Sequence, residues 1–219
     1  MKEKPILFNG EMVRAILDGR KTQTRRVMKN PPRLSENGYD SVWMWGGHEW
    51  HTPYGRHTGT IPQELLAAAP YQIGDRLWVR ESIRIDSDCS AILYVADQAR
   101  VFRGKHVVGY AYYPQDLPWK HSVLSSRFMP KWATRIWLEV TDKRAEQVQD
   151  ITYDDILAEG WDSRTSQPMT EGTAGEDAFL WFRILWDSIN AQRGYPFADN
   201  PWVWVYEFKR LETPAGANQ

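Results

Sequence analysis

The segment from Pro201 to Arg210 places the strongest constraint on the fold. Its residues alternate as in a β-strand, with aromatic side chains on one face and valines on the other: Trp202, Trp204, Tyr206 and Phe208, against Val203 and Val205. A strand that carries large apolar side chains on both faces is buried on both faces. We therefore expect this strand in the middle of the structure.

Three further segments alternate with period two and predict strands: 76–85, 91–96 and 134–141. The predicted strands are few, and the predicted helices do not alternate strictly with them. This order favours the α+β class over a doubly wound sheet. We expect a small mixed β-barrel with flanking helices.

Apolar residues recur at helical spacing in three segments: 9–19, 152–159 and 176–192. Asn9 and Thr152 are suited to cap the first two helices, and Gly19 and Gly160 are suited to end them. The sequence therefore predicts two short helices and one long helix.

Glycine and proline are frequent between residues 30 and 70, where Trp43, Trp45 and Trp50 are interleaved with them. This composition predicts an insertion over 27–70 with little regular structure, which lies over the core as a lid. A second irregular insertion is expected over 97–130. We expect a single domain over 1–211 that carries both insertions, followed by a disordered tail over 212–219.

The charge distribution indicates which ligands to expect, and the cysteine content indicates which cellular compartment to expect. The net charge is −1, but cations gather within 14–33 and acidic residues within 139–177, which permits a local anion-binding site. Cys89 is the only cysteine, so no intramolecular disulfide is possible, as in a reducing compartment. No apolar segment has the length of a signal sequence or a membrane span. We expect a cytoplasmic protein with no membrane partner.

The segment from Gly19 to Arg26 holds four cations and two hydroxyls in eight residues. If it runs extended, Lys21 and Gln23 point to one side, while Thr22, Thr24 and Arg26 point to the other. A twist or bulge could bring Lys21 and Thr24 together. A hydroxyl nucleophile needs a nearby base, and a desolvated lysine can serve as one. The spacing alone favours a solvated, basic strand start.

Several motifs of cofactor and metal sites are absent. The sequence lacks G-x-x-x-x-G-K, G-x-G-x-x-G and G-x-S-x-G. His48-Glu49-Trp50-His51 departs from the H-E-x-x-H zinc spacing, and it falls with His57 in the Gly/Pro-rich segment. Cys89 has no clear base beside it. We expect no metal and no cofactor.

Four blocks of the sequence carry a family resemblance. Residues 19–26 read G-R-K-T-x-T-x-R, and residues 74–79 read G-D-x-L-x-V. Residues 150–161 add a helix that ends in Ala-Glu-Gly, and an aromatic strand before Phe208 closes the series. In this order the blocks resemble the ASCH family, a branch of the PUA-like β-barrels. The whole chain is similar to the larger members that bacteriophages and prophages often carry.

The resemblance implies a PUA-like fold with a pocket for RNA or a modified base. One branch is similar to small amidohydrolases that remove the acyl group from N4-acetylcytidine with a threonine, a lysine and a glutamate. These match Thr24, Lys21 and Glu159. By this match, Thr24 attacks the acyl carbonyl and Lys21 takes its proton, while Glu159 orients the lysine or passes a proton to the leaving amine.

The resemblance also suggests a substrate-binding set: Arg20, Thr22, Arg25, Arg26 and Glu81. Arg26 matches the signature arginine of the family and would steady the oxyanion or the substrate. Glu81 falls on the apolar face of the strand expected over 76–85, so its carboxylate must be paired or hydrogen-bonded. It could instead anchor Lys21 or Arg26 in the core.

Two other functions stay open. The basic segment and the tryptophans of the insertions would suit a non-catalytic module that binds RNA or single-stranded nucleic acid. Other members of the family look like nucleases, which leaves a phage-encoded ribonuclease as an alternative. The expected partner is a modified nucleoside or RNA in every case, and the oligomeric state stays open.

Overall fold

The computed structural model describes residues 1–35, 41–52, 63–86, 91–103, 106–107, 123–162 and 173–212. The chain divides into two compact units. The first contains Met1–Thr22, Ile73–Thr141 and Phe208–Gln219, and the second contains Gln23–Gln72 and Asp142–Glu207. That they act as the single domain expected over 1–211 stays a prediction. Within the described ranges, no helix is long and apolar enough to cross a membrane.

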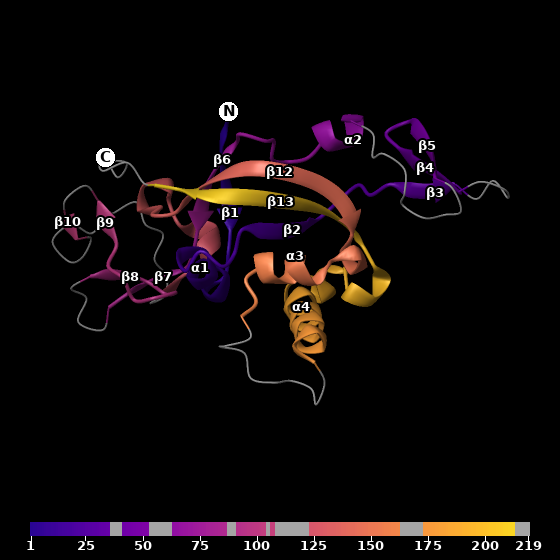
Figure 1. Ribbon diagram of the computed structural model, residues 1–219. Helices are drawn as coiled ribbons and strands as arrows, with labels where there is room; N and C mark the ends of the chain where they lie inside the picture. The colour runs from indigo at the N-terminus through magenta and orange to yellow at the C-terminus, as the bar shows by residue number, and fades with distance from the viewer. Residues whose placement is uncertain are drawn as a thin grey trace. The chain divides into compact units, whose positions relative to one another are not determined.

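Five strands form the main sheet, in the order β1-β6-β12-β13-β2 (Figure 1). They are β1 (Glu3–Leu7), β6 (Arg76–Arg80), β12 (Trp137–Gln147), β13 (Trp202–Leu211) and β2 (Gln23–Val27). β1 pairs with β6 in parallel, whereas β6 with β12 and β13 with β2 pair antiparallel. The mixed sheet and its separate helices confirm the α+β class. Closure of the sheet into a barrel stays a prediction, because β1 and β2 end the strand order.

Strand β13 occupies the position that its two apolar faces predict. It has a neighbour on each side, β12 and β2. Its aromatic face and its valine face are both buried, from Trp202 to Tyr206 and again at Phe208. The expected central strand is therefore confirmed.

The first unit begins with β1 and helix α1 (Gly10–Leu17). The Asn9 side chain caps α1 by accepting a hydrogen bond from the backbone N–H of Met12 at 2.8 Å. Gly19 follows the helix with a φ of +74°, a left-handed conformation that glycine adopts without strain. The predicted cap and end of this helix are confirmed, and the turn delivers the chain to the basic segment.

One long strand was expected over 76–85, and this expectation is wrong. The segment forms β6 and a separate strand β7 (Ile83–Ile85), which pairs with β8 (Ile92–Tyr94) and β11 (Val123–Leu124) in another sheet. The backbone N–H of Glu81 donates to the sulfur of Met129 at 3.2 Å instead of joining a strand ladder. Because Glu81 leaves the ladder, β6 ends at Arg80. The period-two pattern of the sequence nevertheless continues through Glu81.

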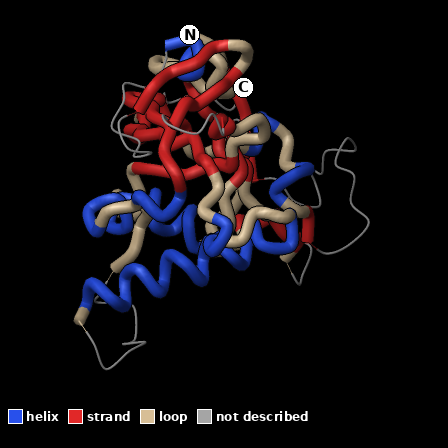
Figure 2. The backbone as a smooth tube through the Cα atoms, turned by 90° about the vertical axis from the view of Figure 1, so that its right-hand side faces the viewer, coloured by secondary structure: helices blue, strands red, loops and turns tan. Residues whose placement is uncertain are grey.

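Two helices of the second unit cover the valine face of β13. These are α3 (Tyr153–Ala158) and α4 (Ala174–Asn190), and each begins with a threonine capping box. Val203 and Val205 join a buried cluster with Ile156 of α3 and with Phe182 and Trp186 of α4. Both helices lie on one side of β2 and β13 in Figure 1, and Figure 2 shows α4 as a long blue helix.

The described parts of both insertions contain regular structure, contrary to expectation. Residues 27–70 include β3 (Arg33–Ser35), β4 (Ser41–Trp45), β5 (His48–Thr52) and α2 (Gln63–Ala67). Gly46 and Gly47 join β4 to β5 with φ of +56° and +86°, as in a type I′ hairpin turn. Residues 97–130 include the short strands β9 (Phe102–Arg103), β10 (His106–Val107) and β11, and a 3-10 turn at Ser126–Phe128. His57, Cys89 and the tail from 213 lie outside the described residues.

We predict that the packing of α3 on β13 contributes strongly to stability. Ile156 is fully buried, whereas its neighbour Leu157 is 38% exposed. Ile156→Ala should lower the free energy of unfolding by about 2–5 kcal/mol, because it leaves a cavity in the cluster. Leu157→Ala, the matched control on the same helix, should cost about 1 kcal/mol or less. Denaturant unfolding followed by circular dichroism measures both, and equal losses would contradict this packing.

Candidate functional site

The basic segment runs into the interior of the protein along β2. Lys21 and Thr24 are each 2% exposed and Arg25 is 5% exposed, whereas Thr22 is exposed and Arg20 is half-buried. The solvated strand start that the spacing favoured is therefore wrong. The reason is that β2 pairs with β13. The interior position of β13 was predicted from its sequence, but its pairing with β2 was not.

The register of this ladder sorts the side chains of β2 onto two faces. Thr24 pairs with Tyr206 and Arg26 with Trp204, on the aromatic face of β13. Arg25 pairs with Val205, on the face that α3 and α4 cover. Thr24 and Arg26 thus share one face, as the alternation predicts.

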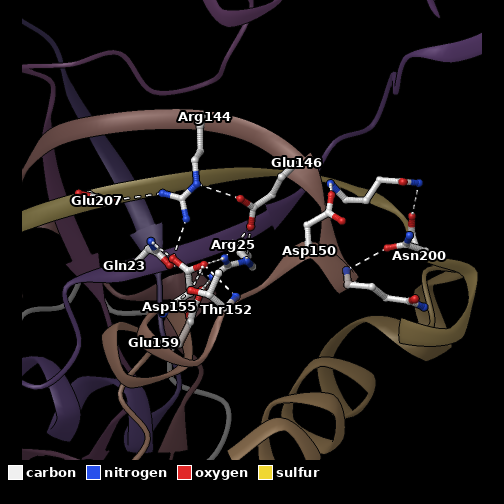
Figure 3. A network of polar contacts seen from close by, with 12 residues as sticks. Gln23, Arg25, Arg144, Glu146, Asp150, Thr152, Asp155, Glu159, Asn200 and Glu207 are labelled. Atoms are coloured by element: carbon white, nitrogen blue, oxygen red, sulfur yellow. Dashed lines mark hydrogen bonds and ion pairs between the residues drawn. The ribbon is translucent and has the colours of Figure 1, made fainter. Parts of the chain in front are cut away.

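Arg25 is the centre of a buried ionic network (Figure 3). Its Nη2 lies 2.5 Å from Glu146 Oε1 on β12 and 3.1 Å from Asp155 Oδ2 on α3. Its Nη1 lies 3.2 Å from Glu159 Oε1 and donates to Gln23 Oε1 at 2.8 Å. Only 1% of the Arg25 side chain is exposed, so its charge depends on these partners rather than on water.

Arg144 extends the network toward the surface. It lies 2.8 Å from Glu146 Oε2, 2.7 Å from Asp155 Oδ1 and 3.1 Å from Glu207 Oε1. Its side chain is 32% exposed, in contrast to Arg25. Glu146 and Asp155 are therefore shared between a buried and a half-buried guanidinium.

Asp155 is the most connected carboxylate of the network. Burial pushes its pKa upward, but hydrogen bonds from Thr152 and the charges of Arg25 and Arg144 outweigh burial, so the pKa lies below its ordinary value. Asp155 also accepts from the Gln23 side chain at 2.9 Å. Its ionised form therefore stabilises both the start of α3 and the approach of that helix to β2.

Glu159 lies directly after α3 and is only 3% exposed. The negative end of the helix dipole disfavours a carboxylate at this position, so a compensating cation is needed. Arg25 supplies it at 3.2 Å. The structure thus brings together two residues of the predicted site, Arg25 and Glu159.

Arg26, Tyr71 and Tyr206 form a second polar group in the same unit. The two tyrosine rings meet edge to face, with their centroids 5.0 Å apart. Burial lowers the pKa of Arg26, although nearby Tyr71 and Glu159 oppose this shift, and burial raises the pKa of both phenols. A guanidinium beside phenol donors is suited to hold a carbonyl oxygen or an anion.

The hydroxyl of Tyr206 is buried and has no hydrogen-bond partner among the described residues. The backbone N–H of Tyr71 lies near enough to oppose the raised pKa of Tyr206, but it does not reach hydrogen-bond geometry. A buried donor without a partner costs free energy, which a ligand oxygen can recover.

Lys21 belongs to the first unit. Its backbone N–H donates to the carbonyl of Ala15 at 3.0 Å, in the turn that follows α1. Its Nζ lies 5.8 Å from the centroid of the Phe8 ring, and Phe8 packs against Phe208. The amine therefore has an aromatic, water-poor environment. That Lys21 meets Thr24 and Glu159 stays a prediction.

Glu81 is paired, as its burial requires. The Nε and Nη2 atoms of Arg135 donate to its two carboxylate oxygens, each at 2.8 Å, and Arg135 also binds Asp97 at 2.7 Å. Burial raises the pKa of Glu81, and Arg135 opposes the shift. These contacts give Glu81 a structural role at the break between β6 and β7, and its role in substrate binding stays a prediction.

Several residues that make polar contacts in this site were not predicted from the sequence: Tyr71, Arg144, Glu146, Asp155 and Tyr206. Tyr206 was assigned only to the apolar core. Arg144 and Glu146 are two positions apart on β12, a spacing that places both side chains on one face of a strand. The strand was expected to end at 141, so this spacing was not used. The sequence does not show which cation each carboxylate would meet.

We predict that Arg25 contributes far more to stability than Arg144. Arg25→Met leaves buried carboxylates without their central cation and should lower the free energy of unfolding by about 3–5 kcal/mol. Arg144→Met removes a partly solvated cation and should cost about 1 kcal/mol or less. Urea unfolding of both variants at pH 7 tests the difference, and similar losses would show that Arg25 is not the centre of the network.

The lowered pKa of Asp155 predicts a pH dependence. Its ionised form contributes stability above its ordinary pKa of about 4, and this contribution is lost as the pH falls through the lower folded-state pKa. Asp155→Asn should therefore destabilise the protein at pH 7, and the two unfolding curves should converge toward pH 2. Asp154→Asn, an exposed neighbour in the same turn, should follow the wild type. A constant gap from pH 7 to pH 2 would argue against an ionised Asp155.

Comparisons with known proteins found few similarities. No family model matches the chain, and no curated protein matches it. The chain is similar to one solved structure, described as the high-resolution crystal structure of an ASCH domain from Lactobacillus crispatus JV V101. The two are 11% identical with a TM-score of 0.40, and the match covers 95% of this chain and 79% of that one.

Proposed function

We propose that this protein hydrolyses an acylated nucleobase such as N4-acetylcytidine, with Thr24 as nucleophile, Lys21 as base and Glu159 as the residue that orients the lysine. The observation that carries the proposal is the face shared by the buried Thr24 and Tyr206 and the half-buried Arg26, on which one hydroxyl lacks a partner among the described residues. Three polar side chains on one face of the β2–β13 pair, one of them with an unsatisfied hydroxyl among the described residues, suit a binding or catalytic site.

The burial of Lys21 supports its role as the base. Lysine is among the residues least often found fully buried, yet this one is 2% exposed beside an aromatic ring. An amine accepts a proton only in its neutral form, and removal from water favours that form. Lys21 lies three residues before Thr24, and the segment that carries it leads into β2.

The proposed reaction uses the groups as follows. Thr24 Oγ1 attacks the acyl carbonyl and transfers its proton to Lys21, which gives a tetrahedral oxyanion. Arg26 and the hydroxyl of Tyr206 stabilise that oxyanion. The carbon–nitrogen bond then breaks as the protonated lysine returns the proton to the leaving amine, and water hydrolyses the acyl-threonine ester.

The contacts of Glu159 suit an indirect role. Its carboxylate is bound to Arg25, which faces α3 and α4, whereas Thr24 faces the aromatic side of β13. Glu159 would therefore act on the lysine and not on the nucleophile itself. The partner of the site is a modified nucleoside, either free or within RNA.

Binding of RNA or single-stranded nucleic acid without turnover is the alternative function, and RNA cleavage is another. The three functions differ in what happens to an RNA that carries N4-acetylcytidine. Hydrolysis leaves the RNA intact and converts the modified base to cytidine, cleavage shortens the RNA, and simple binding changes neither.

We predict that purified protein releases cytidine and acetate from N4-acetylcytidine. Thr24→Val removes the nucleophile at nearly constant shape and should lower kcat/KM by at least about a thousandfold, as should Lys21→Met. Thr24→Ser should keep part of the activity. Thr141→Val, an exposed strand threonine, is the matched control and should leave it unchanged. Liquid chromatography of the products measures turnover.

The proposed activity would be refuted by a folded wild-type protein that releases no product from N4-acetylcytidine or other N4-acylated cytidines. It would also be refuted if Thr24→Val turned over substrate at the wild-type rate. Thermal unfolding of each variant shows whether a loss of activity reflects a loss of fold.

A further inference from the structure

A cavity with two cations in its lining lies in the 27–70 insertion, apart from the residues of the proposed reaction. It has a volume of about 380 Å³, and its walls include Lys29, Asn30, Arg33, Met44 and Trp45. A cavity of this size is within the range of small-ligand sites. None of the described residues that line it is acidic.

The two cations of this cavity are placed by a stiff segment of backbone. Lys29 and Arg33 are exposed and are separated by Asn30 and two prolines, of which Pro32 is buried. Proline fixes φ, so the spacing between the cations varies little. Arg33 begins β3 and pairs with Met44 of β4, which ties it to the hairpin wall. Two cations on one wall create a local positive potential despite the near-neutral whole chain.

Trp45 forms the aromatic wall, and its ring is held in place. Its Nε1 donates to the carbonyl of Asn30 at 2.9 Å, so the indole is fixed between the hairpin and the Lys29–Arg33 segment. The Trp45 side chain is half-buried, which leaves part of it accessible from the cavity. A fixed, accessible indole is a platform for a planar ring.

From this arrangement we infer that the cavity binds a phosphorylated nucleoside, with its phosphate against Lys29 and Arg33 and its base against Trp45. A phosphate suits two cations in a cavity whose described lining holds no acidic residue, and a base suits the fixed indole. Met44, 37% exposed, adds apolar contact beside the ring. The same chemistry fits a free mononucleotide or one nucleotide of single-stranded RNA.

Titration calorimetry with cytidine monophosphate and with ribose 5-phosphate tests the two walls separately. The nucleotide should bind at least fivefold more tightly than the sugar phosphate, because only the nucleotide can stack. Trp45→Ala should abolish this difference, and Trp45→Phe should keep part of it. Lys29→Gln/Arg33→Gln should weaken both ligands at least tenfold. Arg76→Gln/Arg183→Gln, which removes two exposed cations elsewhere, should weaken neither.

A fluorescein-labelled single-stranded RNA distinguishes the two sources of the nucleotide. If the site takes a nucleotide of RNA, the RNA binds more tightly than the mononucleotide. The Lys29→Gln/Arg33→Gln protein then shows a slope of log K against log salt that is shallower by about 0.7, for the one phosphate that the two cations no longer neutralise. If the site takes a free nucleotide, the mononucleotide binds and RNA adds nothing.

The inference is overturned if neither ligand binds the wild type, or if binding is unchanged in both the Trp45 and the Lys29/Arg33 variants. Circular dichroism and thermal unfolding confirm that each variant is folded. The ligands carry no acyl group and the readout is binding, so the result does not depend on the proposed hydrolase activity.

Discussion

The buried charge of Arg25 is the constraint on which the second unit depends. A guanidinium with 1% exposure is stable only if its donors meet acceptors of the protein, and it meets three carboxylates and an amide. Those acceptors come from β2, β12, α3 and the residue that follows α3. One side chain therefore ties a helix and two strands together, and it sets where Glu159 lies.

The candidate site follows from the two faces of β2. One face carries Arg25 and its carboxylates toward α3 and α4, which gives a rigid, ionised support. The other carries Thr24 and Arg26 toward Tyr206, where a hydroxyl has no partner among the described residues. The first face is structural, and the second carries groups of the proposed reaction, an arrangement in which the surrounding structure holds the site residues in place. The cavity beside Trp45 is separate in its residues and in its proposed ligand.

Sequence patterns predicted those helices and strands that depend mainly on residues close together in the chain. The two apolar faces of 201–210 predicted a central strand, and the caps at Asn9 and Thr152 predicted two helices. The hairpin in 27–70 was missed although Gly46-Gly47 between alternating residues is a hairpin signal, because the high glycine and proline content was interpreted as irregular structure. The break at Glu81 was missed because alternation continues through it.

The partners of Arg25 were beyond sequence reasoning for a physical reason. Glu146 and Glu159 lie 121 and 134 residues from it along the chain, and no spacing rule links such distant charges. The burial of Lys21 was likewise hidden, since the basic composition of its segment is typical of a surface.

The most direct test of this account is a double-mutant cycle between Arg25 and Glu159, measured as free energies of unfolding in urea. The single variants are Arg25→Met and Glu159→Gln, and the cycle is closed by the double variant. A buried pair in one network should give a coupling energy of about 1–3 kcal/mol, so that the double variant is more stable than the sum of the single losses implies. Additive losses would show that Arg25 does not hold Glu159, and they would contradict the account of how this site is positioned.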